Sequence, residues 1–147
     1  MRREIFGINS GWGITAVRLA MAAICIVAGG RKWSGGLGVV IDNFAQIGVP
    51  LPTLAGPSIA VLELVGGLLL ALGIVTRWLG LVFAVRFVLA AFFVKFPTQG
   101  WDAGRLDLLL VAGGVLLFLA GPGRAAVDEV WLGSADPPRD AAPQRTP

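Results

Sequence analysis

Long apolar runs dominate the chain, and none of them contains more than two charged residues. They occupy residues 13–30, 54–75, 79–96 and 104–121. A helix needs about 20 mostly apolar residues to cross a hydrocarbon layer about 30 Å thick. The pattern therefore predicts an all-α fold, in which residues 1–133 form a bundle of four transmembrane helices. The tail, 134–147, is rich in Pro, Ala and charge and is predicted to be disordered.

The connections between these runs differ in length. Residues 76–78 join the second and third runs as a tight hairpin, and residues 97–104 form a short, turn-rich loop before the fourth. The first connection is longer, and its apolar residues recur at helical spacing: Leu37, Val40, Ile41, Phe44 and Ile47. This spacing predicts a short amphipathic helix lying in the membrane interface.

Composition and tryptophan placement support a membrane protein. The chain is 56% hydrophobic and 14% charged, whereas soluble domains have about 45–50% apolar and about 25% charged residues. This argues against a soluble enzyme. Tryptophan favours the head-group region, and all five lie at the ends of the runs: Trp12, Trp33, Trp78, Trp101 and Trp131. We expect a multi-pass protein of the cell membrane. The basic residues divide evenly between its two faces, and Arg139 and Arg145 in the tail favour cytoplasmic termini.

Residue counts exclude several kinds of chemistry. The chain has no His, which excludes His-ligated haem, His-ligated zinc and His acid–base catalysis. Cys25 is the single Cys, so no disulfide can form within the chain, and it is expected to be a packing residue. We expect no metal site, and no motif for flavin, haem or an iron–sulfur cluster is recognisable. The small net charge of +3 reflects membrane topology, and we expect no nucleic-acid partner.

Six charged residues lie within the apolar runs. Lys95 and Arg105 are close to the ends of their runs, which leaves four candidates: Arg18, Glu63, Arg86 and Asp107. Such residues are costly in lipid and usually face the interior of a bundle or a functional site. They are therefore the candidate ligand-binding residues, and Glu63 is also the candidate proton-handling residue. A structural clasp that holds the bundle together explains the same charges, and the sequence leaves both interpretations open.

Depth along the helices bears on how these charges pair. At a rise of about 1.5 Å per residue, Arg18 and Arg86 share a layer nearer the termini, and Glu63 and Asp107 share a deeper one. An arginine–Glu63 pair is compatible with this spacing but is not required by it. Gly66 and Gly67 follow Glu63 on its own helical face, where they allow another helix to approach closely.

An ordered series of short motifs resembles the DoxX family of small four-helix membrane proteins. The series covers most of the chain and runs through Arg18-Leu19, Gly29-x-x-Lys32, Gly48-Val49-Pro50-x-Pro52, Glu63-Leu64-Val65-Gly66-Gly67, Leu72-Gly73-x-x-Thr76-Arg77, Gly121-Pro122-Gly123-Arg124 and Asp128. The resemblance implies a membrane-bound oxidoreductase system, which in some relatives is the membrane subunit of thiosulfate:quinone oxidoreductase. It also emphasises Arg18, Glu63 and the two glycines after Glu63.

The chain departs from this family pattern at two positions. Ala28 and Lys95 stand where many members carry His, and Arg105 or Asp107 occupies the region where an acid often begins the fourth helix. The resemblance therefore does not carry a His-dependent proton or metal step to this chain.

Three functions are compatible with the sequence. The first is an accessory membrane subunit of a quinone-linked redox complex, with a partner protein supplying the electrons. The second is a non-enzymatic assembly or scaffold subunit. The third is a small-solute or proton pathway, which requires a homo-oligomer because four short helices leave little room. The lipid bilayer is a partner in all three.

Overall fold

The computed structural model describes residues 4–5 and 8–128 and contains four helices long and apolar enough to cross a membrane. These candidate spans are Gly11–Ser34, Pro52–Leu72, Thr76–Gln99 and Trp101–Ala120. The predicted all-α, four-span fold is confirmed. The predicted tail, 134–147, lies outside the described residues.

Seven helical segments make up the described fold. They are α1 (Ser10–Ser34), α2 (Leu37–Gln46), α3 (Pro52–Leu72), α4 (Thr76–Leu89), the π-helix η1 (Ala90–Lys95), α5 (Phe96–Gln99) and α6 (Trp101–Ala120). Two short strands, β1 (Glu4–Ile5) and β2 (Ile8–Asn9), pair as an antiparallel hairpin before α1. The sequence pattern did not predict this hairpin.

The helix boundaries differ from those expected at two turns. The second run was expected to continue to Val75, but α3 ends at Leu72 because Gly73 and Val75 adopt left-handed backbone conformations (φ 73° and 52°). The expected loop over 97–104 is reduced to Gly100, since α5 continues to Gln99 and α6 begins at Trp101. Proline in an α-helix clashes with the carbonyl four residues earlier. The π-helix η1 has wider turns than an α-helix and ends at Lys95, two residues before Pro97. The chain therefore continues as the helix α5 without this clash.

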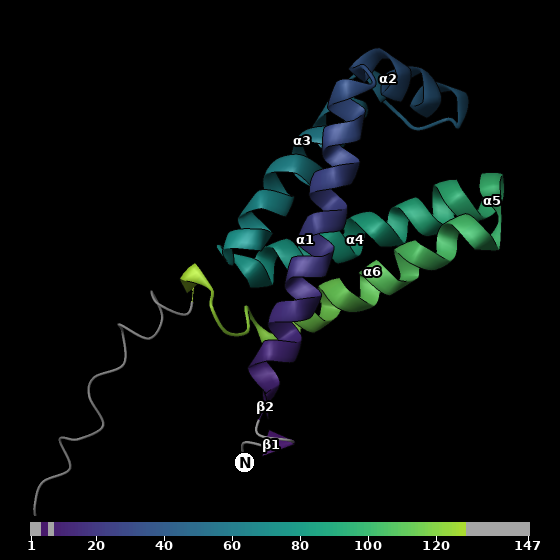
Figure 1. Cartoon of the computed structure of the whole chain (residues 1–147). Helices are drawn as coiled ribbons and strands as arrows, with labels where there is room; N and C mark the ends of the chain where they lie inside the picture. Colours follow the sequence, from purple (N-terminus) through teal and green to yellow (C-terminus); the bar gives the residue numbers. More distant parts are fainter. Residues whose placement is uncertain (1–3, 6–7, 129–147) are drawn as a thin grey trace, which may run out of the picture.

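The helices form two antiparallel pairs. Figure 1 shows α1 beside α3 and α4 beside α6, with the two pairs meeting near the α3–α4 turn and diverging towards α2 and α5. The core lies where the pairs meet, and its largest buried apolar residues are Met21, Leu70, Phe83, Phe87 and Leu117. The outward faces are rich in exposed Leu, Val and Phe, as a helix facing lipid requires.

Buried glycines let these helices approach closely. A Cβ atom at Gly66 would lie 2.9 Å from the Phe83 ring, and one at Gly67 would lie 3.0 Å from the Ile26 backbone. Between α4 and α6, a Cβ at Gly80 would lie 2.7 Å from the Gly114 carbonyl oxygen. Side chains at these positions would push the helices apart, so the glycines set the spacing of the bundle.

The amphipathic pattern of the first connection forms α2, as predicted. Val40 is its buried residue, and with Ile41 it packs against Gly56 near the start of α3. The helix is thereby fixed to the end of the α1–α3 pair that lies away from the N-terminal hairpin (Figure 1).

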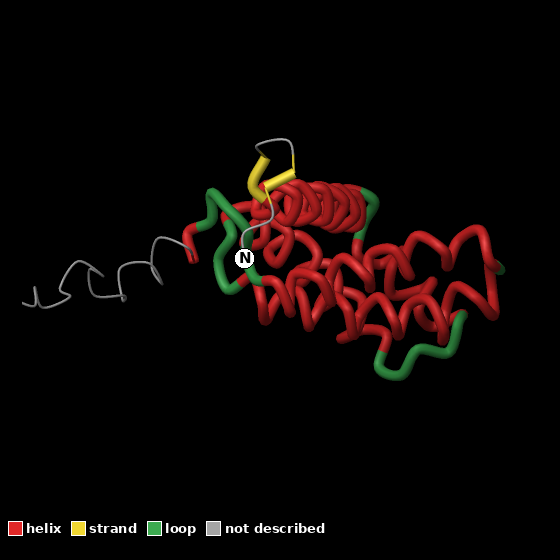
Figure 2. Tube along the Cα trace, turned by 90° about the horizontal axis from the view of Figure 1, so that it is seen from below, coloured by secondary structure: helices red, strands yellow, loops and turns green. Residues whose placement is uncertain are grey.

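A segment after α6, residues 121–128, is folded back across the start of α1, and we call it the C-terminal strap. Arg18 donates hydrogen bonds from Nη1 to the Pro122 carbonyl (2.7 Å) and from Nη2 to the Ala125 carbonyl (3.0 Å). Thr15 Oγ1 donates to the Arg124 carbonyl (2.7 Å), and Arg124 N donates to the Gly11 carbonyl (3.3 Å). The strap lies at the same end of the molecule as the N-terminal hairpin (Figure 2).

Asp128 ties the end of the strap to the α3–α4 turn. Its carboxylate accepts hydrogen bonds from Val75 N (2.9 Å) and Thr76 N (2.8 Å) at the start of α4. Its own N–H donates to the Gly73 carbonyl (3.0 Å). Asp128 therefore caps α4 from a distant part of the chain, satisfying two N–H groups that a helix leaves unpaired.

Candidate functional site

Three charged side chains from three helices meet inside the bundle, and we call Lys32, Glu63 and Arg86 the charge cluster. Glu63 of α3 is only 2% exposed. Its Oε2 accepts from Lys32 Nζ of α1, and its Oε1 accepts from Arg86 Nη2 of α4. The two cations are partly accessible, with side chains 24% and 17% exposed. The Glu63 carboxylate is thus buried, whereas the side chains of Lys32 and Arg86, the open, basic side of the cluster, are accessible from outside.

The α3–α4 hairpin explains why Arg86 reaches Glu63. Glu63 lies nine residues before Leu72, where α3 ends, and Arg86 lies ten residues after Thr76, where α4 begins. At about 1.5 Å per residue, both are about 14–15 Å from the turn. Arg86 is therefore level with Glu63, rather than in the layer of Arg18 as the apolar runs suggested. The difference arises because the turn begins earlier than the runs indicated.

Gly29 brings Lys32 to the same place. A Cβ atom at Gly29 would lie only 2.6 Å from Leu64 N, so α1 and α3 are in backbone contact beside Glu63. Lys32 follows Gly29 by one helical turn and lies on the same face. The close approach at Gly29 therefore places the Lys32 amine against the Glu63 carboxylate.

Two adjacent glycines in α1 allow a matched test of this positioning. Nothing lies within 4 Å of a Cβ built at Gly30, whereas one built at Gly29 would collide with the Leu64 backbone. We expect Gly29→Ala to lower the free energy of unfolding by about 1–3 kcal/mol, as overpacking does. We expect Gly30→Ala to be neutral or slightly stabilising, because alanine favours helix. Thermal unfolding of the two variants in detergent measures the difference, and equal midpoints would contradict the close approach.

The charge cluster carries an excess positive charge. Two cations face one carboxylate, which leaves a formal charge of +1. Within the described part of the chain, Arg86 Nε has no hydrogen-bond partner, and the guanidinium lies 4.6 Å from the centre of the Phe87 ring. Unpaired charge is costly in a membrane setting. The cluster is therefore suited to an electron-rich or negatively charged group.

A second ion pair lies between α6 and the π-helix. Lys95 Nζ donates to Asp107 Oδ1 at 2.7 Å. Asp107 is buried, and its Oδ2 has no hydrogen-bond partner among residues 4–5 and 8–128. Lys95 is the last residue of η1, and its side chain remains partly exposed. Asp107 thus belongs to a pair of its own rather than to the charge cluster.

The four candidate residues predicted from the sequence therefore do not form one site. The structure brings together Glu63 and Arg86 and places Asp107 in a different pair. Arg18 of α1 is 1% exposed and donates to the strap. Cys25 is buried in the apolar core. No group of His, Cys, Asp and Glu that could hold a metal ion occurs in the described part of the chain.

Lys32 is the cluster residue that reasoning from charge in apolar runs missed. It lies in the last turn of α1, beyond the expected end of the first run at residue 30. A basic residue there is ordinarily explained by the helix dipole or by the membrane surface. Its spacing from Gly29 in the Gly-x-x-Lys motif was the available signal.

Comparisons with known proteins agree with this architecture. The DoxX family model matches residues 13–96, which include the whole charge cluster. The chain is also 33% identical over 116 residues to the Bacillus subtilis (strain 168) protein named "Putative oxidoreductase CatD", covering 79% of this chain and 84% of that protein. No solved structure matches the chain significantly. With its four candidate spans, the chain is a multi-pass membrane protein and belongs to the DoxX family.

Proposed function

We propose that this chain is an accessory membrane subunit of a quinone-linked redox system, and that the charge cluster binds the quinone head group. The observation that carries the proposal is the buried Glu63 carboxylate held between two partly accessible cations. Family membership and the oxidoreductase name of the relative support the redox setting. A quinone is also an apolar molecule that reaches its sites through the bilayer, and the bilayer is this protein's environment.

The residues of the cluster fit a quinone head group. Its carbonyl oxygens accept hydrogen bonds, and Lys32 and Arg86 have donors beyond those they give to Glu63. Both cations would stabilise negative charge that develops on those oxygens during reduction. Reduction of a quinone to a quinol takes two electrons, which the partner protein supplies, and two protons, which come from water. Glu63 is a carboxylate in the cluster, so it can pass a proton to the head group only after it has taken one up.

The electrons have to come from outside this chain. The sequence contains no recognisable flavin, haem or iron–sulfur motif, and the described residues contain no metal-binding group. Cofactors carry such redox chemistry, and the protein supplies binding and electrostatics. The proposal therefore assigns electron supply to a cofactor-bearing partner protein.

The scaffold function has its own support in the same cluster. Both carboxylate oxygens of Glu63 are already bonded, and the three residues link α1, α3 and α4. A purely structural clasp would look like this as well. The two functions differ in whether the open, basic side of the cluster binds a ligand.

Lys32→Gln separates these two functions, because it leaves Glu63 and Arg86 as a balanced pair. We expect it to weaken binding of decylubiquinone to the detergent-solubilised protein about 10- to 100-fold, which corresponds to losing one charge-assisted hydrogen bond. The thermal midpoint should change little. The control is Arg105→Gln, which removes a basic residue from an exposed pair with Asp102, and we expect it to leave quinone affinity unchanged.

Two results would contradict the quinone site. The first is a wild-type protein that binds no quinone, and the second is a Lys32→Gln variant with wild-type affinity. Native mass spectrometry of the protein extracted gently from its own membrane adds a further measurement. A bound partner without quinone, together with loss of that partner in Lys32→Gln, would establish the scaffold function instead.

A further inference from the structure

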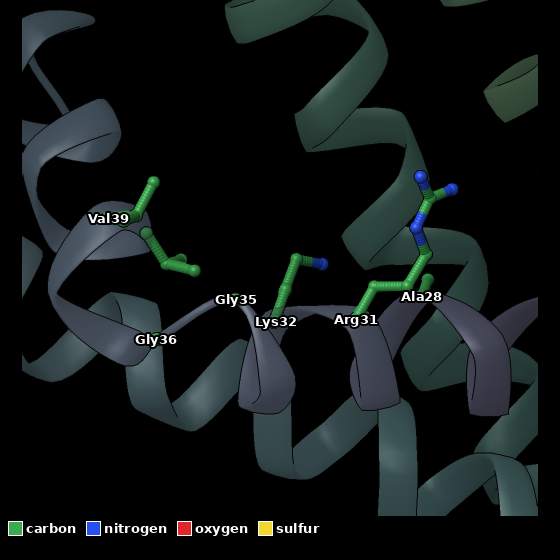
Figure 3. Close-up of a pocket in the computed structure, with 7 residues that line it drawn as sticks. Ala28, Arg31, Lys32, Gly35, Gly36 and Val39 are labelled. Atoms are coloured by element: carbon green, nitrogen blue, oxygen red, sulfur yellow. The ribbon is translucent and has the colours of Figure 1, made fainter.

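A hollow lies where α1 ends and α2 begins, and its lining combines basic and apolar groups. Its volume is about 300 Å³, and it is lined by Ala28, Arg31, Lys32, Gly35, Gly36, Val39 and Val40. Figure 3 shows Arg31 and Lys32 projecting in the same direction from the last turn of α1, with Val39 of α2 beside the same space. None of the lining residues is acidic.

Positive charge around this hollow is not balanced. No acidic side chain among the described residues lies within ion-pair distance of Arg31. Lys32 is bonded to Glu63, which Arg86 already neutralises. Arg31, Lys32 and Arg86 together with the Glu63 carboxylate therefore carry a formal charge of +2. The acidic residue of α2, Asp42, is exposed and does not line the hollow.

The start of α2 adds to this positive field. Its first turn contains no acidic residue, and no side chain caps it at Gly36. The first N–H groups of a helix lack partners within the helix and carry partial positive charge. Gly36 and Val39 line the hollow, so the first turn of α2 borders it.

The hollow lies at the end of a candidate membrane span, where we expect the lipid phosphates to lie. The candidate span of α1 ends at Ser34, three residues after Arg31. Trp33 is nearly half exposed beside them, and tryptophan favours the head-group region. Val39, which is 58% exposed, offers an apolar surface beside the cations. Basic pockets between transmembrane helices bind anionic lipid head groups on the cytoplasmic or matrix side of a membrane. A lipid in this hollow would therefore place α2 on that side, the reverse of the orientation that the tail charges favour.

We infer that this hollow binds the phosphate of an anionic phospholipid. Arg31 and the N-terminal N–H groups of α2 contact the phosphate, and Lys32 adds its charge while it remains bonded to Glu63. The acyl chains extend along the exposed apolar faces of α1 and α2. The inference does not rest on the quinone proposal, because Arg31 is not part of the charge cluster.

Lipid retention measured by native mass spectrometry tests this inference. The full chain is purified in detergent with equal amounts of phosphatidylglycerol and phosphatidylcholine. We expect the wild type to retain phosphatidylglycerol preferentially and Arg31→Gln to lower that retention about fivefold, the factor for one basic residue at a membrane surface. Arg31→Lys, which keeps the charge, should retain most of it. Arg105→Gln is the control for general loss of surface charge, and we expect it to retain wild-type levels.

Several outcomes would overturn the inference. These are equal retention of the two lipids, wild-type retention in Arg31→Gln, and equal losses in Arg31→Gln and Arg105→Gln. Inorganic phosphate provides a further arm. If phosphate alone binds and phosphatidylglycerol does not, the site belongs to a free anion and the lipid assignment is wrong. Because Arg31 is exposed, its variants should fold, and unchanged thermal midpoints would show that they do.

Discussion

Replacing Glu63 with glutamine is expected to lower the free energy of unfolding by about 3–5 kcal/mol, the usual cost of removing one partner from a buried ion pair. Glutamine keeps the size of the side chain but removes its charge. Lys32 and Arg86 would then face each other across a neutral amide inside the bundle. The loss is expected to be large because both cations lose their counter-charge at once.

A double variant shows whether charge imbalance is the cause. Glu63→Gln combined with Lys32→Gln leaves Arg86 as the single cation of the cluster, and its guanidinium can still stack on Phe87. We expect the double variant to be more stable than Glu63→Gln alone by about 0.5–3 kcal/mol, the range for directly interacting residues. Unfolding of each protein is followed by circular dichroism in a common detergent.

Asp102→Asn is the matched control, because it neutralises an acid in the exposed pair with Arg105. We expect it to change stability by no more than about 0.5 kcal/mol. A Glu63→Gln protein as stable as this control would contradict the charge cluster. An unstable Glu63→Gln protein that Lys32→Gln fails to improve would point to lost packing rather than unbalanced charge.

The four spans could be predicted from the sequence because lipid imposes a simple requirement. Each crossing helix must be about 20 residues long and mostly apolar, and hydropathy measures both properties. The boundaries were less predictable because they depend on backbone conformation. The left-handed Val75 ends the α3–α4 turn, and no hydropathy pattern disfavours a valine there.

The pairing of charges could be predicted less well than their presence. Depths measured from the ends of the apolar runs are in error by several residues, because the helices end elsewhere. Each residue also rotates a helical side chain by about 100°, so a small error in position changes the face on which a charge lies. Arg86 was therefore placed in the layer of Arg18, and Lys32 lay beyond the expected end of its span. The π-helix η1 also shifts which face Lys95 presents to α6, and the sequence has no clear signal for it.

The contacts of the strap could not be predicted from the sequence for a different reason. Its residues Gly121, Pro122, Gly123 and Arg124 were recognised as a family motif, but their contacts with Arg18 lie more than 100 positions away in sequence. Charge within an apolar run suggested that Arg18 binds a ligand or an acid. Among the described residues, the carbonyl groups of Pro122 and Ala125 accept hydrogen bonds from it. A guanidinium has five donors and suits this task well, but carbonyl acceptors leave no mark in a sequence.

Replacing Arg18 with methionine is expected to lower the free energy of unfolding by about 3 kcal/mol. The change removes two charge-assisted hydrogen bonds and leaves the carbonyls of Pro122 and Ala125 without these donors. Methionine fills much of the same volume without a charge. Arg105→Met is the control, because Arg105 is an exposed arginine of α6 far from the strap, and its effect should stay within about 0.5 kcal/mol.

Asp128 tests whether the strap acts as one unit. Asp128→Ala removes the cap on Val75 and Thr76 and should cost about 1–2 kcal/mol. If the strap detaches as a whole in either variant, combining Arg18→Met with Asp128→Ala costs less stability than the sum of the two separate losses.

Amide hydrogen exchange provides the direct measurement, because Arg124 N and Asp128 N both donate hydrogen bonds from the strap to other parts of the fold. Arg18→Met should speed exchange at both amides, because Arg18 holds the strap at Pro122 and Ala125, and the strap continues from there to Asp128. Faster exchange at Arg124 alone, with additive free energies, would show that the two anchors hold separate segments.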